Sequence, residues 1–127
     1  MASNRKVLGN LGEDVAAAFL EENGHLILER NWRGGHLEID IISLDKNGVH
    51  FVEVKSRTVP CSAEPQENVT PAKQKRLAAA SLKYLNSPKS KASGADHEAF
   101  FDVITVKFEG EKYEIEYMPQ AFIPIFA

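Results

Sequence analysis

The hydrophobic and polar positions of this chain change their period several times, and each change predicts a new element. Between residues 9 and 23 the apolar residues recur at helical spacing, and Asn23-Gly24 is a typical helix stop. The next segments alternate in the manner of strands, so we expect strands at 25–32, 36–44 and 49–56. The turn signal Asp45-Lys46-Asn47-Gly48 joins the last two strands and predicts an antiparallel hairpin.

The second half of the chain predicts one more helix and two more strands. Residues 58–69 contain two prolines and are expected to form a loop, after which Thr70 is a good N-cap for a helix that begins at Pro71. The inner stripe of that helix is expected to consist of Leu77, Ala80, Ser81, Tyr84 and Leu85. A polar linker at 86–97 leads to strands at 100–108 and 112–118. This order predicts an α/β fold with a mixed sheet flanked by helices.

The composition indicates which class of protein this is, but it says little about the activity. A chain of 127 residues fits one domain over 1–127 with one core, and 43% hydrophobic and 26% charged residues are ordinary values. The chain contains no apolar run of membrane-spanning length and no signal-type segment at its start. Its one cysteine, Cys61, excludes an internal disulfide, and we interpret it as chemically inert. These features together predict a cytoplasmic protein.

The net charge of −3 conceals an uneven distribution. Residues 55–91 contain eight basic and two acidic side chains, which gives +6 and leaves −9 for the rest of the chain. A basic middle segment can attract phosphate locally. Charge alone favours the simpler interpretation, a solvated helix face.

The predicted hairpin brings two carboxylates and a lysine to one place. A two-residue loop at Asn47-Gly48 pairs Asp40 with Lys55, whereas a four-residue loop at 45–48 pairs Asp40 with Glu53. Both registers put these three side chains on one face, because side chains alternate along a strand; a three-residue loop would separate the carboxylates. In either register the Cα atoms of the two acids lie roughly 5–8 Å apart.

Carboxylates at that distance repel each other, and a hard divalent cation such as Mg²⁺ or Mn²⁺ resolves the repulsion. Asp40 and Glu53 are therefore the expected metal ligands, with the main-chain carbonyl of Val54 as a further ligand. Lys55 would stabilise negative charge that develops at a phosphorus atom. The alternative is a plain salt bridge between Lys55 and one carboxylate, and the spacing of the whole set favours a site over it.

Side chains on the two predicted helices extend this candidate site. Glu13 shares its side of the first helix with small residues and would reach the metal, although a rim glutamate near the helix start is an equal alternative. Lys73 and Gln74 lie in the first turn of the second helix, where a helix N-terminus attracts phosphate. For Lys73 alone, a surface lysine with a buried stem is the favoured alternative.

Further basic residues are candidates for contact with a nucleic-acid backbone, namely Lys75, Arg76 and Arg57. Arg57 lies opposite or diagonal to Glu38 in the two-residue-loop register, so an ion pair between strands is its first interpretation. The four histidines show no metal-ligand spacing and are interpreted as structural or surface residues, namely His25, His36, His50 and His97.

Several motifs follow one another along most of the chain. They are Gly12-Glu13, Arg30-Asn31-Trp32-Arg33, Glu38-Ile39-Asp40-Ile41-Ile42, Phe51-Val52-Glu53-Val54-Lys55-Ser56-Arg57, Val69-Thr70 with Lys73-Gln74 and Arg76-Leu77, and Phe101-Asp102-Val103. In this order they resemble the YraN family of small, largely uncharacterised bacterial proteins, which is similar to archaeal Holliday junction resolvases in the restriction-endonuclease-like superfamily. The resemblance implies an αβββαβ core.

The resemblance also assigns roles to individual residues. It implies Asp40 and Glu53 as metal ligands, Lys55 as the catalytic lysine, Glu13 as an acid carried by the helix, and Lys73 or Gln74 as the assisting helix position. One departure is the insertion of His36-Leu37 between Gly34-Gly35 and Glu38, where the family usually has Gly-Gly-Glu-Ile-Asp. The added pair preserves the strand parity of Asp40.

These observations predict an endonuclease that depends on Mg²⁺ or Mn²⁺ and hydrolyses DNA, with specificity for branched or non-standard structures implied by the resemblance. A small domain that cuts two strands needs two sites, so we expect a homodimer. Two alternatives remain open: a nucleic-acid-binding module of the same fold that does not cut, and a protein-interaction domain that uses the acidic residues 96–116.

Overall fold

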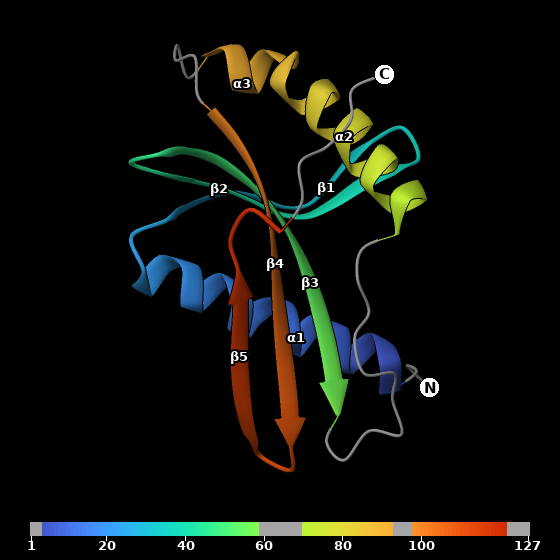
Figure 1. The fold of residues 1–127 in the computed structure, drawn as a ribbon, viewed down its shortest axis with the longest axis vertical. Coiled ribbons are helices and arrows are strands. Elements are labelled where there is room, and N and C mark those ends of the chain that lie inside the picture. Colours follow the sequence, from blue (N-terminus) through green and yellow to red (C-terminus); the bar gives the residue numbers. More distant parts are fainter. Residues whose placement is uncertain (1–3, 59–69, 93–97, 122–127) are drawn as a thin grey trace.

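The computed structural model describes residues 4–58, 70–92 and 98–121. The elements in these ranges are α1 (Asn4–Glu22), β1 (Leu26–Gly34), β2 (Leu37–Asp45), β3 (Gly48–Thr58), α2 (Pro71–Leu85), α3 (Pro88–Ala92), β4 (Glu98–Glu109) and β5 (Lys112–Met118). The order confirms the expected α/β fold with an αβββαβ core, to which α3 and β5 are added (Figure 1). No helix in the described ranges has both the length and the apolar composition that a membrane span requires.

The five strands form one mixed sheet in the order β1-β2-β3-β4-β5. Neighbouring strands are antiparallel except for β3 and β4, which run parallel (Figure 1). A parallel pair needs a crossover connection, and the chain segment that carries α2 and α3 provides it. The mixed sheet predicted from the sequence is therefore confirmed.

Helices cover both faces of the sheet. The adjacent residues Phe51 and Val52 of β3 point to opposite faces, because side chains alternate along a strand. Phe51 belongs to a buried cluster with Leu77 and Tyr84 of α2, whereas Val52 belongs to a second cluster with Leu20 of α1. In Figure 1, α1 passes behind β3, β4 and β5, while α2 lies across the upper part of the molecule.

The β2–β3 hairpin adopts the register of the four-residue alternative. Leu44 pairs with Val49, and Asp45 pairs with Gly48, so only two residues form the tip of the turn. The Asp45 carboxylate stabilises the tip by accepting hydrogen bonds from the backbone N–H groups of Asn47, at 2.9 Å, and Gly48, at 3.2 Å. Gly48 is required here because its φ is +153° and an added Cβ would meet a backbone carbonyl of β4.

Several element boundaries differ from the predicted ones. The first helix begins at Asn4 instead of residue 9, because helical backbone continues beyond the apolar periodicity that marks its buried part. The first strand is shifted by one residue at its start and runs on to Gly34. The expected linker at 86–97 contains the short helix α3, which begins at Pro88, where a proline costs no backbone hydrogen bond. Most of the expected loop at 58–69, with Cys61, lies outside the described residues.

The start of α2 agrees with its prediction. The Thr70 side chain accepts a hydrogen bond from the backbone N–H of Lys73 at 3.2 Å, and Pro71 occupies the first helical position. Four residues of the expected inner stripe are buried, and the fifth, Leu85, is partly buried against the same cluster. This cap and this stripe together direct the first turn of α2 toward β3.

Candidate metal and nucleic-acid site

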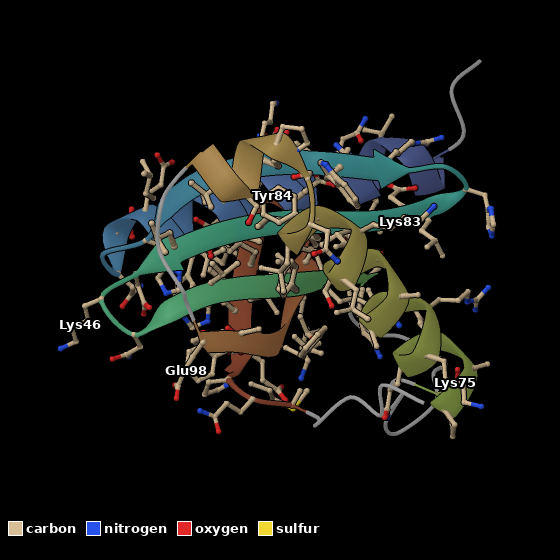
Figure 2. The ribbon with its side chains drawn as sticks, turned by 90° about the horizontal axis from the view of Figure 1, so that it is seen from above. Lys46, Lys75, Lys83, Tyr84 and Glu98 are labelled. Atoms are coloured by element: carbon tan, nitrogen blue, oxygen red, sulfur yellow. The ribbon has the colours of Figure 1, made fainter. Side chains whose placement is uncertain are left out.

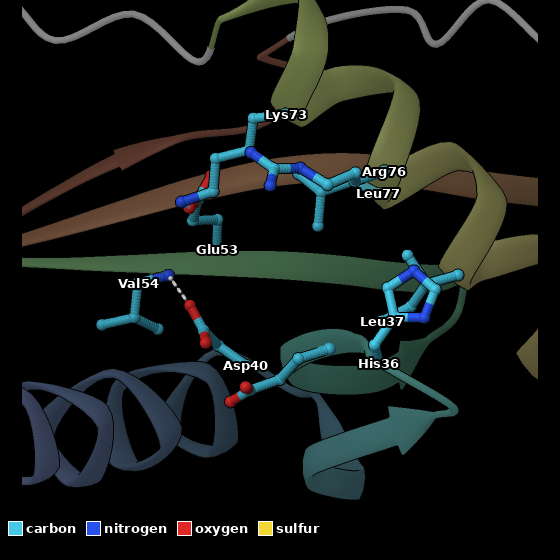
Figure 3. A pocket seen from close by; sticks show the side chains of 9 residues that line it. His36, Leu37, Asp40, Glu53, Val54, Lys73, Arg76 and Leu77 are labelled. Atoms are coloured by element: carbon cyan, nitrogen blue, oxygen red, sulfur yellow. Dashed lines mark hydrogen bonds and ion pairs between the residues drawn. The ribbon is translucent and has the colours of Figure 1, made fainter.

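A pocket of about 490 Å³ opens between β2, β3 and the first turns of α2 (Figure 3). The described residues that line it are His36, Leu37, Glu38, Asp40, Glu53, Val54, Lys73, Arg76 and Leu77. Asp40 and Glu53, the two carboxylates expected to lie together at the hairpin, both line this pocket. The inserted pair His36-Leu37 also lines the pocket.

Asp40 lies where the β2–β3 ladder ends. The β2–β3 pairing ends with Ile41 and Val52, and beyond this pair the Oδ2 atom of Asp40 accepts a hydrogen bond from the backbone N–H of Val54 at 2.9 Å (Figure 3). The side chain thus replaces a ladder hydrogen bond at the point where the two strands separate. This bond keeps the Asp40 carboxylate beside β3.

Strict alternation, which the sequence argument assumed, is wrong around Asp40. Ile39 packs in the cluster under α2 while Ile41 packs in the cluster under α1, although the two positions have the same parity. On the adjacent strand, Asn31 lies between the partners of Ile39 and Ile41 and adopts the left-handed φ of 52°. Both strands therefore change the faces of their side chains at one point, and Asp40 reaches the pocket from this irregular segment.

The environment of Asp40 disfavours its charged form. Burial raises its pKa most, the Val54 N–H lowers it, and the nearby carboxylates of Glu53, Glu13 and Glu38 raise it further, to about 6. The negative charge gathered around Asp40 is therefore only partly compensated by the protein. A bound cation would reverse this effect.

Glu53 is 5% exposed, and its two oxygens have different partners. Oε1 forms an ion pair with Nζ of Lys73, whereas Oε2 is buried without a hydrogen-bond partner in the described structure. An unsatisfied buried carboxylate oxygen is costly unless a ligand satisfies it. The expected phosphate contact of Lys73 is thus replaced, in this structure, by a contact with the carboxylate.

Glu13 approaches Asp40 from α1, as expected, but it has partners of its own. Its Oε1 accepts hydrogen bonds from Nδ2 of Asn31 at 2.8 Å and Nε of Arg30 at 3.4 Å. Burial raises the pKa of Glu13, and these two partners oppose the rise. It does not line the pocket, so its role as a metal ligand stays a prediction. The only sequence signal for Arg30 and Asn31 is their place in the Arg-Asn-Trp-Arg motif.

Lys55 lies two residues beyond Glu53 on β3 and therefore shares its face of the sheet. It is half-buried, pairs across the ladder with Thr105 of β4, and does not line the pocket. Val54 does line it, which keeps its carbonyl as a candidate ligand. The structure thus brings Asp40 and Glu53 to one pocket and places Lys55 next along the strand.

The other basic candidates differ in their positions. Arg76 lines the pocket, Lys75 is exposed outside it, and Gln74 is half-buried. The guanidinium of Arg57 donates to the carbonyl of the preceding residue at 2.9 Å. The two-residue-loop register on which the Arg57–Glu38 pairing depended does not form, and Glu38 instead has an ion pair with Arg33 at 3.5 Å.

The three histidines in the described residues have two kinds of environment. His36 is exposed at the pocket, which agrees with a surface residue, and His97 lies outside the described residues. His25 and His50 are buried, and both lie beside Asp45. Nothing in the sequence indicated this second group, because its three members come from separate elements.

The family model described as Uncharacterised protein family UPF0102 matches residues 12–106. A UPF0102 protein of Bacteroides thetaiotaomicron is 41% identical over 117 residues, covering 92% of this chain and 93% of the relative. A UPF0102 protein of Geobacter metallireducens is 41% identical over 122 residues and covers 96% and 97%. Among solved structures, Pyrococcus furiosus SfsA in complex with Ca²⁺ is similar at a TM-score of 0.40 and 15% identity, covering 91% of this chain and 63% of that one.

The matched range runs from the start of the Gly12-Glu13 motif to Val106 and so includes every strand and helix that forms the pocket. The family match and the two UPF0102 relatives agree with the motif order described above. The chain belongs to the uncharacterised protein family UPF0102, the YraN family that its motifs resemble.

Proposed function

We propose that this protein is a nuclease that depends on Mg²⁺ or Mn²⁺ and hydrolyses DNA phosphodiesters. The observation that carries the proposal is the pocket in which Asp40 and Glu53 meet below Lys73 and Arg76, with one buried Glu53 oxygen that has no hydrogen-bond partner among the described residues. Carboxylate oxygens on one side and cations on the other suit a metal ion together with a phosphate. The family motifs, which resemble those of structure-specific nucleases, support the same activity.

The residues present fit a hard divalent cation. Asp40 and Glu53 supply oxygen ligands, and the unpaired Oε2 of Glu53 is an acceptor that nothing in the described structure satisfies. Burial, together with the nearby carboxylates, raises the pKa of Asp40, and a cation bound there would favour its charged form. The Val54 carbonyl and Glu13 are the further ligands we propose. Water and a phosphate oxygen would complete the shell, since Mg²⁺ keeps several such ligands.

Lys73 connects metal binding with substrate binding. Its side chain is 48% exposed, so it can turn to solvent when a bound cation takes its place at the buried Glu53 carboxylate. A cation at Glu53 would compete directly with the Lys73 ammonium group. Once released, Lys73 lies beside Arg76 at the mouth of the pocket, where both can hold a phosphate.

The reaction needs charge stabilisation and a positioned water. A bound divalent cation supplies both a Lewis acid at the phosphate and a lowered pKa for the attacking water. Lys55, on the same face as Glu53, stabilises the negative charge that develops at phosphorus. The DNA backbone on either side of the scissile phosphate is bound, without recognition of the base sequence, by Lys73, Gln74, Lys75, Arg76 and Arg57. Cutting two strands of a duplex or junction requires two such sites, which a homodimer would supply.

The proposal is tested by a cleavage assay on duplex, single-stranded, flap and four-way-junction DNA with Mg²⁺ or Mn²⁺. We expect cleavage by the wild type, loss of cleavage in Asp40→Asn and Glu53→Gln, and loss in Lys55→Ala with DNA binding retained. Lys46→Ala is the matched lysine control, because Lys46 is exposed in the β2–β3 turn and lies at the opposite end of the view from Lys75 in Figure 2.

Measurements of DNA binding distinguish residues needed for cleavage from residues needed for binding. Lys73→Ala and Lys75→Ala should each weaken DNA binding and reduce the dependence of log Kd on log salt by about one counterion. Cleavage that persists undiminished in purified Lys55→Ala and Glu53→Gln proteins would refute the assignment of the site. Absence of cleavage on every substrate, with salt-sensitive binding retained, would identify a module that binds nucleic acid without cutting.

A further inference from the structure

A second group of possible metal ligands lies apart from the proposed nuclease pocket. His25 follows α1, Asp45 ends β2 and His50 belongs to β3, so the group joins three segments. Nε2 of His50 lies 2.9 Å from Oδ1 of Asp45, and Nε2 of His25 lies 3.6 Å from Oδ2 of the same residue. One ligand atom from each of the three residues lies within 4.8 Å of the others. Small side-chain shifts would suffice for all three to contact one ion.

Each of the two imidazole rings also has a hydrogen-bond partner at its Nδ1 atom, on the side away from Asp45. Nδ1 of His25 is 2.9 Å from Oγ of Ser43, and Nδ1 of His50 is 2.6 Å from Oδ2 of Asp102. Histidines that bind metals almost always have such a partner on the second nitrogen, because it sets the ring orientation and the tautomer. Both Nε2 atoms are thereby directed at the same carboxylate.

Asp102 is positioned as a supporting carboxylate and not as a ligand. It is 1% exposed, and its remaining acceptor positions receive the Tyr117 hydroxyl at 2.7 Å and the backbone N–H of Gln120 at 2.9 Å. The Asp102–His50 pair therefore has the carboxylate–histidine arrangement that supports a metal ligand. Phe100 stacks on the His50 ring at a centroid distance of 4.9 Å and further restrains it.

The charges of the group also favour a cation. Both ring nitrogens of His50 face a carboxylate, and even a protonated His50, which could donate to both, offsets only one of their two negative charges. A divalent ion between Nε2 of His50 and Asp45 would neutralise both carboxylates, whereas one proton neutralises only one. A cavity of about 570 Å³, lined in part by His25, Asp45 and His50, gives water access to the group.

The group is separate from Asp40 and Glu53. His50 and Glu53 lie three residues apart in β3, and side chains three apart in a strand point to opposite faces. His50 lies on the face covered by α1, together with Val52, and Glu53 lies on the face covered by α2. Among the residues that the structure describes, the two cavities share no lining residue.

We propose that His25, Asp45 and His50 bind a first-row transition-metal ion of the Zn²⁺ class through two Nε2 atoms and one carboxylate oxygen. Two imidazoles and one carboxylate suit Zn²⁺ and its neighbours better than Mg²⁺, which prefers oxygen ligands. The cavity provides the remaining coordination position for water or another small ligand. The ion would join the end of α1 to the β2–β3 hairpin.

The test uses an Asp40→Asn/Glu53→Gln background, which removes the first proposed metal site. After treatment with a chelator, this protein is titrated with Zn²⁺ by calorimetry and with Co²⁺ by visible absorption. We expect one equivalent of bound ion, a Co²⁺ spectrum of low coordination number, and no competition from Mg²⁺ at equal concentration. Zn²⁺ should also raise the melting temperature, because an ion that binds only the folded state stabilises it.

Single histidine replacements locate the ion. His25→Gln should weaken Zn²⁺ binding at least about tenfold, the usual consequence of a lost ligand or ligand partner. His36→Gln, which removes an exposed histidine outside the group, should bind as the background protein does. His50→Gln should weaken Zn²⁺ binding as much as His25→Gln does. Circular dichroism in chelator checks that each variant folds. If His50→Gln does not fold because Asp102 loses its partner, His25→Gln alone tests the site.

Two results would overturn the proposal. One is a folded background protein that binds neither Zn²⁺ nor Co²⁺, which would make the group a hydrogen-bonded support of the fold. The other is equal Zn²⁺ binding by His25→Gln and His36→Gln, which would place the ion elsewhere. Neither result depends on nuclease activity, because the background protein lacks the acids proposed for it.

Discussion

Replacing Asp40 by asparagine should stabilise the metal-free protein at neutral pH. Asparagine has nearly the same shape, and its side-chain oxygen can still accept the Val54 N–H that Asp40 accepts at 2.9 Å. The replacement therefore removes a charge without removing the hydrogen bond. The charge is unfavourable because burial and the neighbouring carboxylates raise the pKa of Asp40 to about 6 from 3.8.

The sign and size of the effect follow from that pKa. Below the ordinary value of 3.8, Asp40 is protonated in both the folded and the unfolded chain, and its ionisation does not affect stability. As the pH rises toward about 6, the unfolded chain loses the proton first, so the free energy of unfolding of the wild type falls. Each tenfold change in a dissociation constant is about 1.4 kcal/mol, so the full loss is about 3 kcal/mol.

The assay is urea unfolding of Asp40→Asn and wild type in chelator across this pH range. The two proteins should be similar near pH 4, and the variant should be more stable by about 3 kcal/mol near pH 8. Glu111→Gln, in the exposed β4–β5 turn, is the control and should show no such divergence. Mg²⁺ should stabilise the wild type and not the variant. A variant less stable than the wild type at neutral pH would refute the reasoning, since it would show that the Asp40 charge is already compensated.

Three other replacements test the packing around the site by chemical denaturation. Gly12→Ala should lower the free energy of unfolding by about 1–3 kcal/mol, because the new Cβ would overlap with the Ser56 hydroxyl. Gly9→Ala on the same helix places its Cβ in open space and should stabilise the protein. Equal effects of the two replacements would contradict the close approach of α1 and β3. Asn31→Ala should cost more than Asn31→Gly, because both lose the bond to α1 but only glycine accepts the positive φ without strain. Thr70→Ala should cost about 1 kcal/mol and Thr70→Ser little, as expected for a helix cap.

Local signals were sufficient for most of the elements. The helical spacing in α1, the Thr70-Pro71 start of α2 and the turn at Asp45–Gly48 each depend on residues close in sequence. Element ends were less predictable. Helical backbone extends to Asn4 without an apolar pattern, and the five-residue helix α3 buries too little to produce one.

The sequence by itself limited the hairpin to a few registers, because its turn signal is short, and two of the three loop lengths place Asp40 beside Glu53. Tertiary structure decided the choice between the two open registers and the change of faces at Asp40, because both depend on how β1 and the two helices pack against the hairpin. It also decided that Lys73 pairs with Glu53.

The proximity of His25 and His50 to Asp45 likewise depends on the tertiary structure. No spacing rule connects the end of α1 with two positions in a hairpin, since their separation along the chain contains no repeated period. Periodicity encodes which face a side chain occupies within one element. The distance between side chains of different elements is set by packing, which brings together segments whose order in the chain does not predict their contact.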